Sequence, residues 1–433
     1  MELAAENKLN AAQHYSPTST PVLDVFRPLP PQSKDSLSAG EYFLASSMVI
    51  LALVGLPSLR ALIDAAPGFW AALVLCAAAL IAGFTHEAGH LLAGVLAGFK
   101  LRQIRTGPIH LGRQARCGEP YCGDALILGS AVFEPRVTGA ADAVLRRRLM
   151  GLMLGGPLAS LLLAGALEIS LALTRPGFAV AFGLHVGAAF SALIGIAALL
   201  PDVNRRGNFS DGARLLMLLK NDNRAERWIS NIRCQIALNL GRHPRDWDQA
   251  CVSRAAAVND DSRDAFVSRW LAYLWAAERQ DITSATKYLE GALESLAYST
   301  PKLRDHLFLE AAVFQAWFRD NPSKALFWEY RIRNNKLRRL QKLRLDIALL
   351  WAEGRLFDAW EQLGTVYLTE LRQLPASPGR ALTEESASEW RRQMESRMLT
   401  RAWRSMYSLS RQLEPSALQE GFAAPQNQKI ASW

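Results

Sequence analysis

The sequence predicts a mainly α-helical, polytopic membrane protein. About four transmembrane helices, a small β element at the cytoplasmic face and a C-terminal α-helical domain are expected. Long apolar stretches are confined to residues 42–200, whereas residues 218–433 are polar with apolar residues at helical spacing. Net charge divides in a similar way, because residues 1–204 carry +1 of the total +9 and residues 205–433 carry +8. The mean hydropathy of +0.03 therefore averages an apolar half and a polar half.

Four segments are expected along the chain. Residues 1–41 are rich in Pro, Ser and Thr and contain few large apolar side chains, which is typical of a disordered tail. Residues 42–217 form the expected membrane domain. Residues 218–374 form an expected helical domain, and residues 375–433 a C-terminal helix and tail that begin in a Pro- and Gly-containing stretch.

Each apolar stretch of the membrane domain is near or above the ~20 residues that cross ~30 Å of hydrocarbon. Pro57 and Arg60 interrupt the end of the first stretch. The four predicted spans are residues 42–63, 68–98, 149–173 and 177–200.

The loops between these spans predict an orientation. The connection from residue 99 to 148 holds nine Lys and Arg against four acidic residues, and Arg205 and Arg206 follow the last span. Positive charge is enriched in cytoplasmic loops. We therefore expect a multi-pass membrane protein with the connection and both termini in the cytoplasm. The expected membrane is a bacterial inner membrane.

The second span contains an HExxH pattern formed by His86, Glu87 and His90. Residues i and i+4 lie on one face of a helix, so both imidazoles can bind one metal ion. Glu87 beside them can act as a general base on a water molecule. Ionisable groups inside an apolar helix are costly and usually functional, which favours a metal site over a chance occurrence.

A zinc site with only two histidines lacks its third protein ligand. Two carboxylates follow the fourth span, Asp202 and Asp211. Spacing alone does not choose between them, and Asp-Gly at residues 211–212 is also an ordinary turn signal.

Three motifs occur in an order that resembles the site-2 protease family of intramembrane zinc metalloproteases. The HExxH pattern is the first of them. Gly-Gly-Pro-Leu-Ala-Ser at residues 155–160 is similar to the family's AGPLAN-type motif, and Ser-Asp-Gly at residues 210–212 is similar to its final motif. The resemblance covers residues 69–217, about a third of the chain.

The resemblance implies a zinc ion (Zn²⁺) bound by His86, His90 and Asp211, with Glu87 as the catalytic base. It leaves Asp202 as a residue at a helix end.

The expected substrate-positioning residues depart from the family pattern. Ala198 stands where the family has Asn before a Leu-Leu-Pro stretch, and Ser160 stands where the AGPLAN motif ends in Asn. Asn204 and Asn208 are the expected replacements. Ser160, Asn204 and Asn208 are therefore predicted to position substrate.

The family implies hydrolysis of a peptide bond in or near a transmembrane segment of a membrane-anchored substrate. This substrate is either a single-span membrane protein or a signal-peptide-like segment. The alternative is a catalytically silent membrane adaptor of the same family, which uses its helical domain to bind partners. A di-iron oxidase is set aside, because only two of the seven histidines are clustered.

The connection at residues 99–138 contains alternating apolar and polar residues, which predict a small β hairpin or sheet at the membrane face. The resemblance implies that these strands receive unwound substrate, and a purely structural cover is the alternative. Cys117 and Cys122 mark a turn and lack the further ligands of a metal site. His185 in the fourth span is either a functional or a packing residue.

The polar half is expected to be helical almost throughout. Ala285, Ala325 and Ala359 lie 40 and 34 residues apart within helical patterns. This spacing resembles tetratricopeptide helical hairpins, whose period is 34, and a non-repeating bundle is the alternative. The domain is expected to present substrate or bind a protein partner.

A basic amphipathic run occupies residues 336–344. Such a run is usually a solvated helix face, and contact with anionic lipid is the second interpretation. No other feature of the sequence favours nucleic acid. The expected partners are therefore the lipid bilayer, the substrate and a protein partner, with no nucleic acid.

Overall fold

The computed structural model describes residues 68–106, 109–112, 130–135, 142–204, 207–299, 301–332 and 337–413. Four predicted features lie outside the described residues: the tail at 1–41, the first span at 42–63, the turn with Cys117 and Cys122, and the end of the chain after 413.

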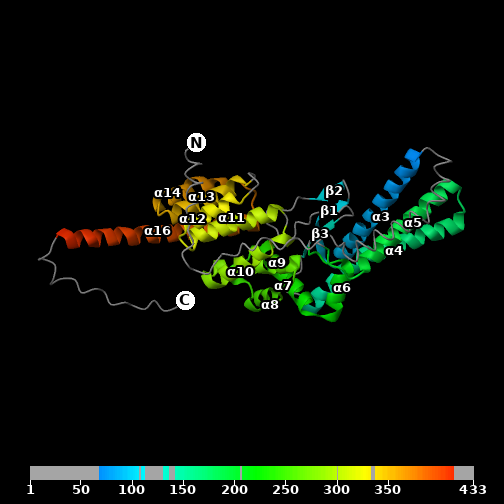
Figure 1. Ribbon diagram of the computed structural model, residues 1–433, viewed down its shortest axis with the longest axis horizontal. Coiled ribbons are helices and arrows are strands. Elements are labelled where there is room, and N and C mark those ends of the chain that lie inside the picture. The colour runs from blue at the N-terminus through cyan, green and yellow to red at the C-terminus, as the bar shows by residue number, and fades with distance from the viewer. Residues whose placement is uncertain are drawn as a thin grey trace. The chain divides into compact units, whose positions relative to one another are not determined.

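Two compact units make up the described chain, and they divide between Phe308 and Leu309. The elements of the first unit are, in order, α3 (Gly68–Leu96), β1 (Phe99–Thr106), β2 (Ile109–Gly112), β3 (Ser130–Pro135), α4 (Asp142–Thr174), α5 (Phe178–Leu199), α6 (Asp211–Lys220), α7 (Asn223–Asn239), a 3₁₀ turn (Pro244–Asp246), α8 (Gln249–Ala257), α9 (Arg263–Glu278), α10 (Ile282–Glu294) and a 3₁₀ turn (Leu296–Tyr298) (Figure 1).

Helix α11 (Pro301–Trp317) contains the division between the units. The second unit continues with α12 (Pro322–Tyr330), α13 (Arg339–Ala352), α14 (Leu356–Gln362), a π-helical turn (Leu363–Tyr367), α15 (Leu368–Arg372) and α16 (Pro378–Leu413).

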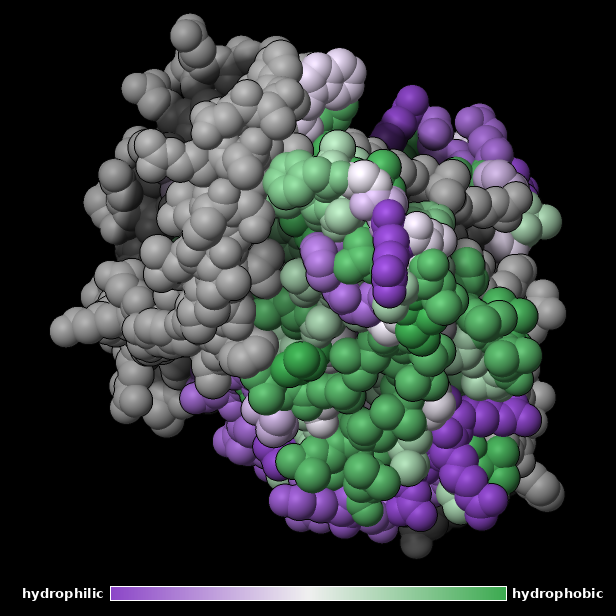
Figure 2. All heavy atoms as spheres, turned by 90° about the vertical axis from the view of Figure 1, so that its right-hand side faces the viewer, coloured by the Kyte–Doolittle hydropathy of each residue, from purple (hydrophilic) through white to green (hydrophobic). Residues whose placement is uncertain are grey.

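Three described helices are long and apolar enough to cross a membrane: α3 over Ala72–Leu96, α4 over its whole length and α5 over its whole length. This finding indicates a membrane protein. The three helices coincide with the second, third and fourth predicted spans. All three helices carry exposed apolar side chains, for example Ile81, Leu162 and Val180. Figure 2 shows apolar side chains gathered on the face that is turned to the viewer.

The connection between α3 and α4 carries a three-stranded antiparallel sheet in the order β2-β1-β3. Gln103 of β1 is opposite Gly112 of β2, and Phe99 is opposite Pro135 of β3. The register shifts between Leu101 and Gln103, as at a β-bulge. Strands β2 and β3 are the edges of the sheet. Its location at a cytoplasmic membrane face stays a prediction.

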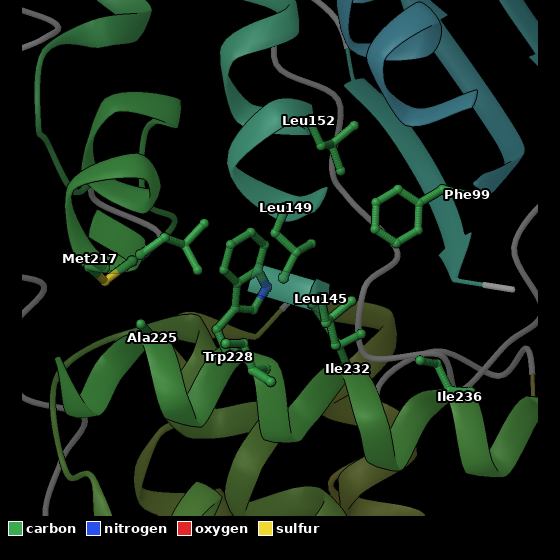
Figure 3. Close-up of a cluster of buried hydrophobic side chains, with 11 residues drawn as sticks. Phe99, Leu145, Leu149, Leu152, Met217, Ala225, Trp228, Ile232 and Ile236 are labelled. Carbon is green, nitrogen blue, oxygen red and sulfur yellow. The ribbon is translucent and has the colours of Figure 1, made fainter. Parts of the chain in front are cut away.

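A cluster of buried apolar side chains packs the start of α4 on α7 (Figure 3). Leu145 and Leu149 of α4 join Trp228 and Ile232 of α7, and Phe99 at the start of β1 completes this group. Because α4 begins at Asp142, its first two turns lie before the predicted span, and within them Leu145 is buried against α7. The predicted domain boundary after residue 217 therefore falls inside a compact unit.

An ion pair connects α6 to α9. The Arg214 guanidinium donates hydrogen bonds of 2.8 and 3.0 Å to the two carboxylate oxygens of Asp264. It also lies over the Trp228 ring, 4.2 Å from the centroid. The Asp264 side chain is only 2% exposed. Burial alone would raise the pKa of Asp264, but the charge and hydrogen bonds of Arg214 outweigh it and hold this pKa below its usual range.

In the second unit, the tryptophan rings form a stacked core. The Trp317 centroid lies 4.4 Å from that of Trp351 and 4.0 Å from that of Trp390. Ala325 of α12 and Ala359 of α14 are fully buried, as small residues at helix crossings are. Whether these helices form a tetratricopeptide array stays a prediction.

The described part of the basic run belongs to this unit. Arg344 pairs with Glu310, and Arg339 pairs with Glu370 at 3.0 Å. These two charges are thus balanced within the unit, while Lys336 lies outside the described residues.

We predict that Asp264→Asn destabilises the first unit by about 3–5 kcal/mol, because it leaves the Arg214 charge without its carboxylate. Denaturant unfolding of the purified protein in detergent measures this loss. The control Arg224→Gln removes an exposed pair with Asp222 and should cost at most ~1 kcal/mol. Equal losses of stability in Asp264→Asn and Arg224→Gln would contradict a buried ion pair.

Since the folded-state pKa of Asp264 lies below ~3.9, the stabilisation that this carboxylate provides is present at neutral pH and is lost as the pH falls below about 4.

Candidate metal centre

Helices α3 and α4 approach each other closely at two glycines. A Cβ atom added to Gly89 would overlap the Gly155 carbonyl oxygen, and one added to Gly155 would meet the Cβ atom of Ala93. Small residues of this kind let apolar helices pack backbone against backbone. The HExxH turn of α3 is therefore held directly against α4.

Each histidine of the HExxH pattern has its Nδ1 atom bound to α4. His90 donates from Nδ1 to the Leu152 carbonyl oxygen at 2.7 Å, and His86 Nδ1 lies 3.1 Å from Ser160 Oγ. A donating Nδ1 leaves the Nε2 lone pair of His90 available as a ligand. Such outer hydrogen bonds orient the histidine ligands of metal sites.

The two Nε2 atoms converge on the Asp211 carboxylate. His86 Nε2 and His90 Nε2 lie 3.2 Å apart. Asp211 Oδ2 lies 3.3 Å from His86 Nε2 and 3.2 Å from His90 Nε2. Two imidazole nitrogens and one carboxylate oxygen form a donor set that can hold a metal ion.

Ser210 places Asp211 at the start of α6. Its hydroxyl accepts a hydrogen bond from Ala213 N at 3.1 Å, which is an N-cap contact, and donates to the Leu200 carbonyl oxygen at 2.6 Å. A Cβ atom at Gly212 would overlap the Leu199 carbonyl oxygen. The Ser-Asp-Gly motif therefore brings the start of α6 against the end of α5, with Asp211 next to the histidines.

The electrostatic surroundings keep Asp211 ionised. Burial alone would raise the pKa of Asp211, but its contacts with His86 and His90 outweigh burial and hold this pKa far below its usual range. A metal ligand must be in this deprotonated form.

Asp202, the competing carboxylate, lies elsewhere. Among the described residues the potential metal group contains Asp211 and not Asp202. The backbone N–H of Asp202 donates to Ser210 Oγ at 3.0 Å. Its side chain borders a cavity of about 350 Å³, lined also by Phe209 and Leu216. The structure thus places Asp211, and not Asp202, beside the two histidines, a choice that sequence spacing alone does not make.

Gly156 leaves open the space beside the two rings. A Cβ atom there would overlap His90 Nε2 and lie 2.8 Å from His86 Nε2. No other residue type fits at this position without displacing a ring, so the glycine keeps room where the donor atoms point.

Glu87 is buried in α3, with 6% exposure. It precedes His90 by three residues, so these two side chains are neighbours on the helix surface. The HExxH pattern is thus buried as a group.

The other predicted site residues have local partners. Ser160 is fully buried and pairs with His86. The Asn204 side chain accepts from the backbone N–H of Asn208 at 3.0 Å, which closes the turn after α5. His185 pairs with Glu168 of α4 at 3.0 Å, away from the metal group, on exposed side chains.

One contributor to the centre has no signal in the sequence. The Leu152 carbonyl orients His90, and a backbone oxygen is present at every position. Only the packing of α3 on α4 selects it.

No family model, curated protein or solved structure matches this chain.

We predict that Gly156→Ala lowers metal affinity by more than about 100-fold. Losing a hydrogen bond that orients a ligand typically lowers metal affinity about 10–100-fold, whereas the added methyl group would displace the ligand rings themselves. Metal content of the purified protein, measured by mass spectrometry, gives the result. Gly151→Ala is the matched control, because a Cβ there meets nothing within 4 Å. Retained metal in Gly156→Ala would refute the assignment of this space to the site.

We also predict that Asp211→Asn loses the metal ion, because it replaces an anionic ligand, while Asp202→Asn retains it. The same metal analysis, with dialysis against a chelator, compares the two proteins. The reverse result would make Asp202 the ligand.

Proposed function

We propose that this chain is an intramembrane zinc metalloprotease, of the kind its motifs resemble, that cleaves a peptide bond in or near a transmembrane segment. The observation that supports this proposal is the convergence of His86 and His90 on Asp211 at the start of α6. The two histidines and Glu87 belong to a helix apolar enough to span a membrane. Buried ionisable groups in such a helix are costly and mark functional sites.

Zinc is the metal that the donor set favours. Ligand atoms ~2.0–2.1 Å from a tetrahedral zinc ion lie about 3.3–3.4 Å from one another. The three donor atoms are 3.2–3.3 Å apart, which agrees with this requirement. Two imidazoles and one carboxylate are also the ligands of known catalytic zinc sites, which keep a fourth position for water or substrate.

The chain's own residues would then divide the work of hydrolysis. When bound, zinc supplies Lewis acidity that polarises a carbonyl group and makes a water molecule more acidic. Glu87 would accept a proton from the attacking water and pass it to the leaving amide nitrogen. Ser160 and the Leu152 carbonyl hold the imidazoles in place during these steps.

Substrate reaches such a site only after its helix unwinds, because the backbone groups of a membrane helix are paired within it. Among the described strands, β2 and β3 are the edges of the sheet, and an extended peptide can add to a sheet edge. We propose that the sheet receives the unwound segment of a single-span protein or a signal-peptide-like substrate. The C-terminal helical domain would select or present this substrate.

The proposed location is a bacterial inner membrane, with a multi-pass chain and both termini in the cytoplasm. The positive charge of the connection supports this orientation. The cleaved bond would then lie toward the cytoplasmic side.

We predict that Glu87→Gln keeps its metal ion, because Glu87 is not in the donor set, but lowers cleavage about 10²–10⁴-fold. Comparing the membrane proteomes of cells with the wild-type and variant proteins should reveal a single-span protein that accumulates in the variant.

Wild-type levels of every membrane protein in the Glu87→Gln cells would contradict the protease mechanism and favour the silent adaptor. Metal analysis of the Glu87→Gln protein shows whether the variant has lost only the catalytic base or the bound metal ion as well.

A further inference from the structure

The C-terminal part of α16 carries an exposed apolar stripe. Leu399, Trp403, Met406 and Tyr407 are 57–69% exposed. Their spacing of i, i+4, i+7 and i+8 puts them on one helix face. Earlier in the same helix the pattern is different, because Met394 is fully buried within the unit. In Figure 1 the later part of α16 extends beyond α14 and α13.

The charge of this segment is of one sign. Residues 396–413 contain four Arg and no Asp or Glu: Arg397, Arg401, Arg404 and Arg411. At 100° per residue Arg397 and Arg401 lie on the side of the helix away from the apolar stripe, whereas Arg404 and Arg411 lie along its edge, ~60° and ~40° from Tyr407. Two of them also contact the unit, since Arg397 pairs with Asp320 and Arg401 donates to the Gly354 carbonyl oxygen.

We propose that residues 396–413 bind the surface of an anionic lipid bilayer, with the apolar stripe in the interface. A helix with Trp and Leu on one face, Arg beside that face and on the opposite side, and no long apolar run has the pattern of interfacial helices. Trp and Tyr favour the membrane–water interface. Arg404 lies at the edge of the stripe, where its long side chain can reach anionic headgroups while its stem covers apolar surface.

The charge pattern argues against a second copy as the occupant. Paired helices usually flank their apolar seam with charges of both signs, whereas two copies of this segment would repel each other. The apolar spans of the same chain also keep a bilayer close by. Tethering turns a weak surface affinity into high occupancy through effective concentration.

Hydrogen exchange of the full-length protein in lipid nanodiscs tests this proposal. One set of discs contains phosphatidylcholine alone, and the other an equal mixture with phosphatidylglycerol. Backbone amides of residues 396–413 should exchange at least about tenfold more slowly in the anionic discs. Amides of α13 should exchange equally in both and report that the unit is folded.

Two variants and a control define the binding face. Leu399→Gln with Trp403→Gln should remove the protection, and Arg404→Gln should reduce the difference between the two lipids. Phe357→Gln, which changes a side chain on α14 that is 63% exposed, should leave the protection unchanged. Equal exchange in both lipids, or protection that depends on several protein copies per disc, would overturn the proposal.

Discussion

His86, His90 and Asp211 bring three potential ligand atoms to within 3.2–3.3 Å of one another, where α3, α4 and the start of α6 meet. Burying polar and charged groups costs free energy unless they are paired. The surrounding contacts reduce this cost and keep the geometry. Ser160 and the Leu152 carbonyl hold the rings from α4, and Ser210 holds the start of α6.

This arrangement depends on backbone approach as much as on the ligands. Gly89 and Gly155 let α3 and α4 touch, Gly156 leaves space for the donor atoms, and Gly212 lets α6 begin against the end of α5. The Arg214–Asp264 ion pair then connects α6 to α9. Asp211 and Arg214 lie on the same short helix, so contacts made by α9 help to keep the carboxylate in place.

Part of this structure can be predicted from the sequence, because some features depend on local spacing. The HExxH pattern places His86 and His90 on one helix face, and the length of the apolar stretches predicts the three described spans. Other features depend on contacts between distant residues. The choice of Asp211 over Asp202 follows from the Ser210 cap and the close approach at Gly212, which spacing does not reveal.

Local contacts of this kind also involve Asn204. Its side chain accepts a hydrogen bond from the Asn208 backbone N–H, as short polar side chains after a helix often do with nearby backbone groups, and its role in positioning substrate stays a prediction. The predicted boundary after residue 217 follows hydropathy and stays a prediction. Leu145 and Leu149 of α4 are buried against Trp228 and Ile232 of α7, within a compact unit that continues to Phe308.

X-ray absorption spectroscopy of the purified protein loaded with zinc tests the central claim most directly. A centre built from these three residues should give nitrogen and oxygen neighbours at ~2.0–2.1 Å and the more distant scattering of two imidazole rings. A sulfur atom at ~2.3 Å, or the scattering of fewer than two imidazoles, would contradict a centre built from His86, His90 and Asp211.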